Sequence, residues 1–494
     1  MILFGTGGIR GRMIPGEFDD ELVARVTRGV ARWMKDRGKS HALVAYDTRN
    51  KSSWFAQLVV STFIEEGVEA ETFERPVPTP LLSYAVRKLG VDLGVVITAS
   101  HNPPEYNGYK VYRADGVQIL PDMAEELKTY ISMVNEKDPP RILEKLPVVQ
   151  NTIFKDYMED IMNMLSRYRL PRLRMVYSPL HGTGLGFVDE VLKNLGVEVV
   201  KVQQQTCMDG NFPTTRTPNP EDDEALEMLK SVMLERDVDY GIATDPDCDR
   251  VGLVVKKGRK FFRLSGNQVG VILTYFILNN MKQTGETEKP YLVKTIVSTD
   301  MVDPICEEKK VRVFETPTGF KYIGDLITRE EAKGNNGFLF AFEESCGYLA
   351  GDFVKDKDGV IGSALIALAT DMYDPLELLE ELYRKYGYFM EKLLNYRFSS
   401  VDEAVKVYEN MKKKDIERIR DVLVEKAVDY ARGVGNIPKN ETYMLSFSNG
   451  RVYFRPSGTE PKLKVYIKVM EETKEKALRT MERMTDFVNS LIKG

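Results

Sequence analysis

Short apolar runs alternate along the chain with longer stretches that have helical spacing. The runs at 43–46, 175–177 and 291–293 are rich in β-branched and aromatic residues, a composition that predicts buried strands. Apolar residues recur with the period of a helix over 22–34 and 187–195. Strands that alternate with helices in this way predict an α/β protein with mixed, mainly parallel sheets.

Each third of the chain also contains a second strand that leads into a polar loop. The apolar runs at 93–98, 238–243 and 337–342 each end at hydroxyl or carboxyl side chains. Open α/β sheets bind ligands at the carboxyl ends of their strands, so we expect the three loops to face one central cleft. The repeat predicts three related α/β domains.

The pattern changes after residue 375. Charged helices are followed by alternating strands at 443–447, 451–454 and 463–470, and an amphipathic helix closes the chain over 471–492. These elements predict an α+β domain of different build at the C-terminus. The four expected domains cover residues 1–145, 146–262, 263–385 and 386–494.

Composition and charge narrow the class of protein. A chain of 494 residues is too long for one hydrophobic core, and 43% hydrophobic and 29% charged residues are typical of globular domains. The net charge of −5, without a basic domain, disfavours a nucleic-acid partner. We expect no membrane span and no signal peptide, because no apolar run approaches about 18 residues and residues 1–6 lack a basic region. Four cysteines without a CxxC pair predict reduced thiols in a cytoplasmic protein.

The loop after the strand at 93–98 presents a hydroxyl group. Its sequence is Thr98-Ala99-Ser100-His101-Asn102-Pro103-Pro104, and Asn107-Gly108-Tyr109-Lys110 follows. Two consecutive prolines prevent both a continued strand and a helix, which leaves Ser100 at the end of the strand. An Asn-Pro turn without chemistry explains the loop equally well.

A glycine-rich segment at 4–12 carries two arginines. Glycine permits a close backbone approach, and Arg10 and Arg12 can bind a phosphate group bidentately. A merely flexible terminus is the alternative interpretation.

Three carboxylates lie within five residues after the strand at 238–243. Asp245, Asp247 and Asp249 repel one another unless a cation neutralises them, and their hard oxygen atoms suit Mg²⁺. A solvated acidic turn is the alternative, although the preceding strand is strongly apolar. A calcium EF-hand is excluded, because Arg250 and Lys256 stand where that loop needs glycine and glutamate.

The last two loops carry weaker signals on their own. Glu343 and Ser345 follow the strand at 337–342 and can hydrogen-bond to hydroxyl groups of a ligand, but such a string also arises by chance at a helix start. Between two alternating strands, an arginine and two hydroxyls suit a phosphate dianion, whereas a plain hairpin turn explains only the proline and glycine. The residues of this loop are Arg455, Ser457, Gly458 and Thr459.

In this order the motifs resemble those of the α-D-phosphohexomutases, the phosphoglucomutase and phosphomannomutase superfamily, over essentially the whole chain. The resemblance implies that Ser100 is a phosphoserine nucleophile contacted by Arg10. It implies one Mg²⁺, held by Ser100 and the three aspartates. Glu343 and Ser345 would bind the ring hydroxyls of a sugar, and the loop at Arg455 would bind its phosphate group.

The resemblance also implies roles for other basic side chains. Lys110 is the expected general base, and His101 and Lys357 are further catalytic candidates. Lys321, in a smaller matching motif at 316–321, is expected to bind substrate.

The sequence departs from the superfamily at Tyr348, where many relatives carry histidine. The histidines of this chain stand at positions 41, 101 and 181, so a histidine base in that loop is impossible. Tyr348, together with residues 356–360, is similar to the phosphoglucomutase-2 and phosphopentomutase branch.

The implied activity interconverts glucose 1-phosphate and glucose 6-phosphate through a phosphoserine enzyme and a glucose 1,6-bisphosphate intermediate. A mannose or pentose mutase is the alternative within the superfamily. A serine phosphatase would release inorganic phosphate, and a non-catalytic sugar-phosphate sensor would need neither Ser100 nor three aspartates. The expected partners are small sugar phosphates, with no nucleic acid and no membrane, and the sequence leaves the oligomeric state open.

Overall fold

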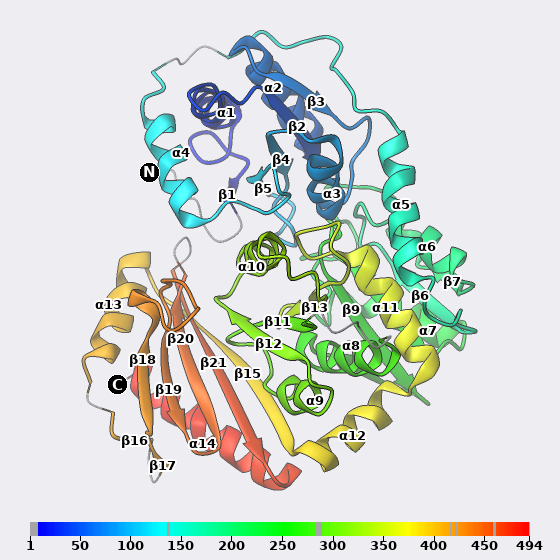
Figure 1. Ribbon diagram of the computed structural model, residues 1–494, viewed down its shortest axis with the longest axis vertical. Coiled ribbons are helices and arrows are strands. Elements are labelled where there is room, and N and C mark those ends of the chain that lie inside the picture. Colours follow the sequence, from blue (N-terminus) through cyan, green and yellow to red (C-terminus); the bar gives the residue numbers. More distant parts are fainter. Residues whose placement is uncertain are drawn as a thin grey trace. The chain divides into compact units, whose positions relative to one another are not determined.

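Figure 1 shows the computed structural model, which describes residues 8–135, 139–281, 289–414, 416–419, 422–457 and 461–493. The chain forms two compact units. Unit 1 comprises Met1–Leu292 and Gly319–Pro375, and unit 2 comprises Val293–Thr318 and Leu376–Gly494. No helix in the described part of the chain is both long and apolar enough to span a membrane.

The first sheet of unit 1 is mixed. Its elements are β1 (Ile9–Arg12), α1 (Asp20–Lys35), β2 (His41–Tyr46), α2 (Ser52–Glu65), β3 (Glu69–Thr72), α3 (Thr79–Leu89), β4 (Leu93–Ile97), β5 (Tyr106–Arg113) and α4 (Pro121–Ser132). The strand order is β1-β5-β4-β2-β3, with β2 parallel to β3 and β4, and β5 antiparallel to β4 and β1. α1 begins where the Asp19 carboxylate accepts a hydrogen bond from the Leu22 amide, and its apolar face packs into the core of this sheet.

The second sheet repeats this arrangement. Its elements are α5 (Thr152–Leu165), β6 (Arg174–Ser178), α6 (Val188–Asn194), β7 (Glu198–Lys201), η1 (Gln203–Gln205), α7 (Glu227–Glu235), β8 (Tyr240–Thr244), β9 (Val251–Lys257) and β10 (Lys260–Leu264). The order is β10-β9-β8-β6-β7, with β6 parallel to β7 and β8, and β9 antiparallel to β8 and β10. β8 therefore takes the place in this sheet that β4 takes in the first.

The third sheet has the same central pair. Its elements are α8 (Gly266–Asn280), β11 (Tyr291–Thr295), α9 (Val302–Glu308), β12 (Arg312–Thr316), α10 (Phe320–Ala332), β13 (Phe338–Glu343), β14 (Gly347–Leu349) and α11 (Gly359–Met372). In the order β12-β11-β13-β14, β13 lies beside β11 as β8 lies beside β6. The predicted repeat of three mixed α/β sheets is confirmed.

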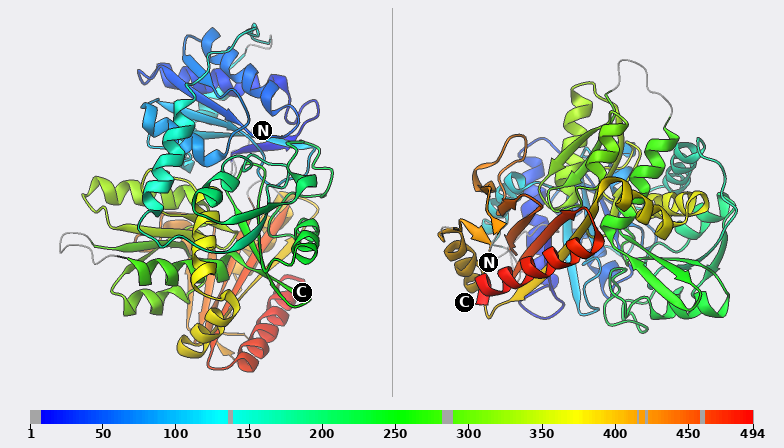
Figure 2. Two further views of the ribbon diagram at one scale, coloured as in Figure 1. Left: turned by 90° about the vertical axis from the view of Figure 1, so that its right-hand side faces the viewer. Right: turned by 90° about the horizontal axis from the view of Figure 1, so that it is seen from below.

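The C-terminal sheet of unit 2 is antiparallel throughout. The elements are α12 (Pro375–Tyr386), β15 (Tyr388–Arg397), α13 (Val401–Lys412), β16 (Arg418–Ile419), β17 (Val422–Leu423), β18 (Lys426–Asp429), η2 (Tyr430–Arg432), β19 (Tyr443–Phe447), β20 (Gly450–Pro456), β21 (Lys462–Glu471) and α14 (Lys474–Lys493). Figure 2 shows α14 along one face of the sheet ordered β15-β21-β20-β19-β18. The expected α+β build is confirmed. α14 begins at Lys474 rather than at residue 471, because β21 continues to Glu471 in its pairing with Tyr388 of β15.

Buried charges connect the two segments of unit 2. The Lys294 ammonium group on β11 lies 2.6 Å from an oxygen of Asp300 and 3.1 Å from one of Asp303. Asp300 also pairs with Lys468 of β21 at 2.6 Å and with Arg451 of β20 at 3.2 Å. These ion pairs hold Val293–Thr318 against the C-terminal sheet.

In unit 1, the buried helix α11 begins at a buried carboxylate. Asp358 accepts hydrogen bonds from the amides of Val360 and Ile361 at 2.8 and 2.9 Å, and from the Tyr157 hydroxyl at 2.7 Å. Burial raises the pKa of Asp358 to about 6, although these hydrogen bonds partly oppose the rise.

We predict that Asp358→Asn removes part of the pH dependence of stability. Because the pKa of Asp358 is raised from 3.8 to about 6 in the folded protein, its contribution is fully present below its ordinary pKa and is lost as the pH rises through about 6. Asparagine keeps the acceptor for the two helix amides, so the fall in melting temperature between about pH 4 and pH 6 should become shallower. Asp358→Ala, the contrasting variant, should cost about 1–2 kcal/mol at every pH by loss of the cap. Equal slopes in wild type and Asp358→Asn would contradict this origin of the pH dependence.

Candidate active site

The predicted nucleophile follows β4, whose five residues are all buried. Ser100 is 1% exposed and has a φ of 53°, in the left-handed region that residues other than glycine rarely adopt. Its amide donates to the Thr98 hydroxyl at 2.9 Å. Its hydroxyl donates to Asp245 Oδ2 at 2.9 Å and lies 3.3 Å from His101 Nδ1. The loop therefore holds a buried serine in a strained conformation, with its hydroxyl directed at the aspartate loop.

The three aspartates follow β8 at the position that Ser100 takes after β4. Asp245, Asp247 and Asp249 are buried, and each offers an oxygen within 4.8 Å of the others. Asp245 Oδ1 accepts hydrogen bonds from the amides of Asp249 and Arg250 at 3.1 and 3.0 Å, which folds the loop around this carboxylate. The structure thus brings together the four residues that the sequence predicted as metal ligands.

Two lysines from other segments face these carboxylates. Lys110 of β5 donates to Asp247 Oδ2 at 2.8 Å and to Asp249 Oδ2 at 3.5 Å. Lys357, in the loop before α11, lies 2.9 Å from Asp249 Oδ2. Both lysines that the sequence marked as catalytic candidates therefore lie at the aspartate cluster.

The buried charges shift the pKa values of their neighbours. Burial, with the charges of Asp249 and Asp247, raises the pKa of Asp245 well above 3.8. Burial also acts to raise the pKa of Asp247, but Lys110 outweighs it and the pKa is lowered. Burial would lower the pKa of Lys357, whereas the nearby carboxylates, above all Asp249, raise it. The cluster therefore favours the charged form of Lys357 and disfavours the ionised form of Asp245.

Arginines lie around the Ser100 loop. Arg10 is exposed and donates to the Asn102 side chain at 3.3 Å. Arg250 pairs with Glu221 at 2.9 Å. Burial and then the charges of Arg250 and Arg10 lower the pKa of His101 well below 6.5, so this imidazole is neutral at neutral pH.

The third loop adds an acid beside Lys357. Glu343 ends β13, is 6% exposed, and has a pKa that burial raises. A Cβ at Gly347 would lie 2.6 Å from Lys357 Cδ and 3.0 Å from Glu343 Cγ, so glycine is needed where these two side chains meet. Ser345 is half-buried in the turn between β13 and β14. Lys321 is a buried residue at the start of α10.

Tyr348, which stands where many relatives carry histidine, is a core residue in this structure. Its side chain is fully buried, stacks on Phe340 with ring centroids 6.4 Å apart, and donates from its hydroxyl to the Gly266 carbonyl at 3.4 Å. Tyr348 therefore belongs to the packed core of the third sheet.

The predicted phosphate loop lies in unit 2. Arg455 is half-buried near the end of β20, and the Ser457 amide donates to the Lys462 carbonyl at 2.8 Å, which closes the β20–β21 turn. Gly458 and Thr459 lie outside the described residues.

Comparison with known proteins gives one family along the chain. Four models match in order, described as phosphoglucomutase/phosphomannomutase alpha/beta/alpha domains I, II and III and C-terminal domain, over residues 1–138, 155–258, 265–386 and 403–485. A phosphoglucomutase of Staphylococcus saprophyticus is 30% identical, over 100% of this chain and 94% of that protein. The chain belongs to the phosphoglucomutase/phosphomannomutase family.

Further members extend this assignment. A "Probable phosphoribomutase" of Schizosaccharomyces pombe is 31% identical, over 99% of this chain and 90% of that protein. A phosphoglucomutase/phosphomannomutase family protein from Burkholderia thailandensis has the same fold, with a TM-score of 0.75 at 20% identity over 99% of this chain and 98% of that chain. Members of this family are isomerases that transfer a phosphoryl group within a sugar phosphate.

The phosphoglucomutase/phosphomannomutase family depends on Mg²⁺, and the aspartate cluster fits this ion. Asp247 Oδ1 and Asp249 Oδ1 are buried and accept no hydrogen bond from any residue that the structure describes. Buried carboxylate oxygens normally have a partner, so these two atoms are suited to ligating a cation. Hard oxygen donors are the ligands that Mg²⁺ prefers.

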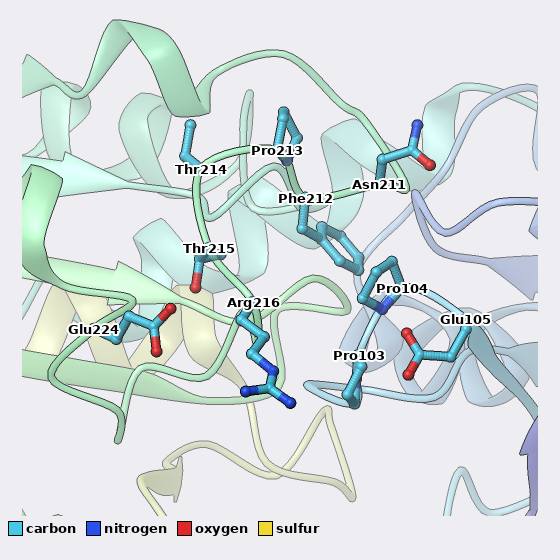
Figure 3. Close-up of a pocket in the computed structure, with 10 residues that line it drawn as sticks. All are labelled: Pro103, Pro104, Glu105, Asn211, Phe212, Pro213, Thr214, Thr215, Arg216 and Glu224. Atoms are coloured by element: carbon cyan, nitrogen blue, oxygen red, sulfur yellow. The ribbon is translucent and has the colours of Figure 1, made fainter.

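A pocket of about 550 Å³ is lined on one side by the end of the Ser100 loop. Figure 3 shows Pro103, Pro104 and Glu105 on one side of it and Phe212 and Arg216, from the segment after η1, on the other. The pocket thus lies between loops that follow strands of the first and second sheets.

Three polar residues of this region were missed by the sequence analysis. The Thr79 hydroxyl donates to Asp247 Oδ2 at 2.9 Å from the start of α3. Arg49, with Asp47, lies in the loop directly after β2 and contacts the backbone of the Ser100 loop. For Asp47 and Arg49 the available signal was the charged sequence at the end of the buried strand β2, the same feature that marked the other loops, whereas nothing local marked Thr79.

We predict that Asp247→Asn and Asp249→Asn weaken the binding of Mn²⁺, a paramagnetic substitute for Mg²⁺. Each variant loses a charged ligand, so the dissociation constant measured by electron paramagnetic resonance should rise by about 10- to 100-fold or more. Asp239→Asn is the matched control, because Asp239 stands just before β8 and pairs with Lys256 at 3.1 Å instead. Wild-type affinity in both cluster variants would rule out this metal site.

Proposed function

We propose that the protein is a phosphoglucomutase that interconverts glucose 1-phosphate and glucose 6-phosphate. The observation that carries the proposal is the 2.9 Å contact of the Ser100 hydroxyl with Asp245 in a buried cluster of three aspartates. This arrangement suits a serine that exchanges a phosphoryl group beside a divalent cation. The full-length similarity to a phosphoglucomutase supports the choice of substrate.

In the proposed cycle the enzyme starts with a phosphoryl group on Ser100. A sugar hydroxyl oxygen attacks phosphorus, the new sugar O–P bond forms, and the bond between phosphorus and Ser100 Oγ breaks. The proton lost by the sugar hydroxyl ends on Ser100 Oγ, and the product is glucose 1,6-bisphosphate. After the bisphosphate turns over, the reverse transfer from its other phosphate regenerates phosphoserine, so inorganic phosphate is not released.

Charged side chains of unit 1 have assigned roles in this transfer. Arg10 is proposed to contact the phosphoserine, and Lys357 to neutralise charge at the aspartates. Bound Mg²⁺ supplies positive charge where the transferred group and the serine oxygen become negative. Lys110, which pairs with Asp247, is proposed to be the general base: it takes the sugar proton and gives one of its own protons to Ser100 Oγ as the serine O–P bond breaks. His101 Nδ1 lies 3.3 Å from Ser100 Oγ. His101 is proposed to accept a hydrogen bond from the Ser100 hydroxyl once that oxygen is protonated.

Substrate selection is assigned to the remaining loops. Glu343 and Ser345 are proposed to bind ring hydroxyls, with Lys321 as a further substrate contact. The loop of Arg455, Ser457, Gly458 and Thr459 is proposed to bind the phosphate in either orientation of the bisphosphate. These roles fall in the proposed domains 1–145, 146–262, 263–385 and 386–494. The proposal includes a cytoplasmic location, which the four free cysteines support.

A phosphomannomutase or a phosphopentomutase is the second candidate. The pentose activity is favoured by the similarity to a protein named as a phosphoribomutase, whose identity of 31% is close to the 30% of the phosphoglucomutase. Ratios of kcat/KM for glucose, mannose and ribose 1-phosphates separate these candidates.

We predict that purified protein carries substoichiometric phosphate on Ser100, which exchanges with labelled glucose 1,6-bisphosphate and is located by mass spectrometry. Ser100→Ala should lose roughly 1,000-fold or more of mutase turnover, because the group that carries the phosphoryl is gone. Ser132→Ala, at the exposed end of α4, is the control and should behave as wild type. Near wild-type turnover of Ser100→Ala would end this assignment, and stoichiometric release of inorganic phosphate would identify a phosphatase instead.

We predict that substitutions at Ser345 and at Arg455 have different effects on substrate selectivity. Ser345→Ala should change the ratio of kcat/KM for glucose 1-phosphate to that for mannose 1-phosphate. A polar partner left unpaired costs about 1–3 kcal/mol, or roughly tenfold or more in discrimination. Arg455→Ala should lower kcat/KM for both substrates by a similar factor, because both substrates carry the phosphate group that this arginine is proposed to bind. If both variants change the ratio alike, this division between sugar and phosphate recognition is wrong.

A further inference from the structure

A buried arginine in the loop after β2 contacts the backbone of the Ser100 loop. The Arg49 side chain is 0% exposed and has both terminal nitrogens directed at carbonyl groups. Nη1 donates to the carbonyls of Pro103 and Tyr106 at 2.8 and 3.2 Å, and Nη2 donates to those of Ser100 and Asn102. One guanidinium group therefore bonds four carbonyl groups within seven consecutive residues.

Asp47 fixes this arginine and the start of the same loop. Its carboxylate lies 3.4 Å from Arg49 Nε and accepts from the hydroxyls of Thr98 and Ser52 at 2.6 and 2.7 Å. Thr98 in turn accepts from the Ser100 amide. Burial lowers the pKa of Arg49 to about 10, and Asp47 opposes this, so the guanidinium remains charged at neutral pH.

Phe212 covers the other side of the guanidinium group. The Arg49 Cζ atom lies 5.0 Å from the centroid of the Phe212 ring, within the range of a cation–π contact. The ring is buried at the edge of the pocket in Figure 3 and approaches from the segment after η1. Arg49 is thus enclosed between its own strand-end loop, the Ser100 loop and the second domain.

We propose that Arg49 is a positioning residue, which fixes the backbone of the Ser100 loop and thereby directs the Ser100 hydroxyl toward Asp245. Ser100 has a φ of 53°, and a residue in this region keeps its conformation only where the surrounding structure imposes it. The hydrogen bond from Nη2 to the Ser100 carbonyl imposes it at the strained residue itself. The catalytic consequence of this role rests on the proposed function, whereas its effect on the loop does not.

The test compares two substitutions of Arg49 with one substitution of a second buried arginine in the same domain. Arg49→Met removes the four donors while keeping an unbranched side chain, and Arg49→Lys keeps the charge but cannot make the directed set of bonds. Arg28→Met is the control, because Arg28 is 4% exposed on α1 and pairs with Glu65 at 3.3 Å, away from the loop. A general loss of stability should appear in all three variants.

Two measurements separate positioning from folding. Hydrogen exchange, read by mass spectrometry on a peptide covering residues 98–106, should be about tenfold or more faster in both Arg49 variants and unchanged in Arg28→Met. In mutase assays kcat should fall by about 100-fold in Arg49→Met, with KM within about threefold, since a misplacement near 1 Å costs this much. Arg49→Lys should recover part of the kcat.

Several outcomes overturn the inference. Wild-type exchange in the 98–106 peptide of the Arg49 variants would overturn it, as would an increase of equal size in the other peptides of the first domain. If Arg49→Met does not fold, Arg49→Lys decides by the same two readouts. If the wild type shows no mutase activity, the proposed function fails, and hydrogen exchange alone still decides whether Arg49 holds the loop.

Discussion

Three buried carboxylates whose oxygens lie within 4.8 Å of one another are the constraint that organises unit 1. Removing an ion from water costs of the order of several kcal/mol, and like charges add repulsion, so such a cluster persists only where opposite charges meet it. Lys110 comes from β5 of the first sheet, and Lys357 comes from the loop before α11. The cluster after β8 is therefore completed only when three segments, distant in the sequence, pack together. The groups suited to phosphoryl transfer therefore also link these three segments of unit 1.

The repeated sheet order explains why the reactive loops can meet. β4, β8 and β13 lie next to β2, β6 and β11 in their sheets and end in a polar loop, and an antiparallel neighbour then leads the chain back. That returning strand gives a second position close to each loop. On β5 the position is used by Lys110, whereas on β14 it is used by Tyr348, which packs into the core. The same backbone plan thus supports charge chemistry in one copy and packing in another.

Local patterns were enough to predict the strands, the order of the loops and the aspartate cluster, because each of these features lies within a few consecutive residues. The contacts of Arg49 could not be predicted in this way. Its guanidinium bonds main-chain carbonyls 51–57 positions away, and any residue type supplies a carbonyl, so the sequence carries no mark of the partner. Tyr348 shows the converse limit. It stands in a loop motif where many relatives carry histidine, whereas its side chain stacks in the core and its hydroxyl bonds a backbone carbonyl.

The composition of unit 2 follows from the same physics. The hydrophobic pattern assigns Val293–Thr318 to a third α/β repeat, and that repeat is present in the strand order. Yet this segment forms one compact unit with the C-terminal residues. Within that unit Asp300 pairs with Lys294, Lys468 and Arg451, which come from three separate strands. Each of these charges, taken alone in the sequence, is indistinguishable from an exposed one. Apolar periodicity therefore predicts the elements of this protein, whereas their long-range association in unit 2 depends on a buried ion cluster together with the apolar contacts of Ile296 and Val297 with the C-terminal sheet.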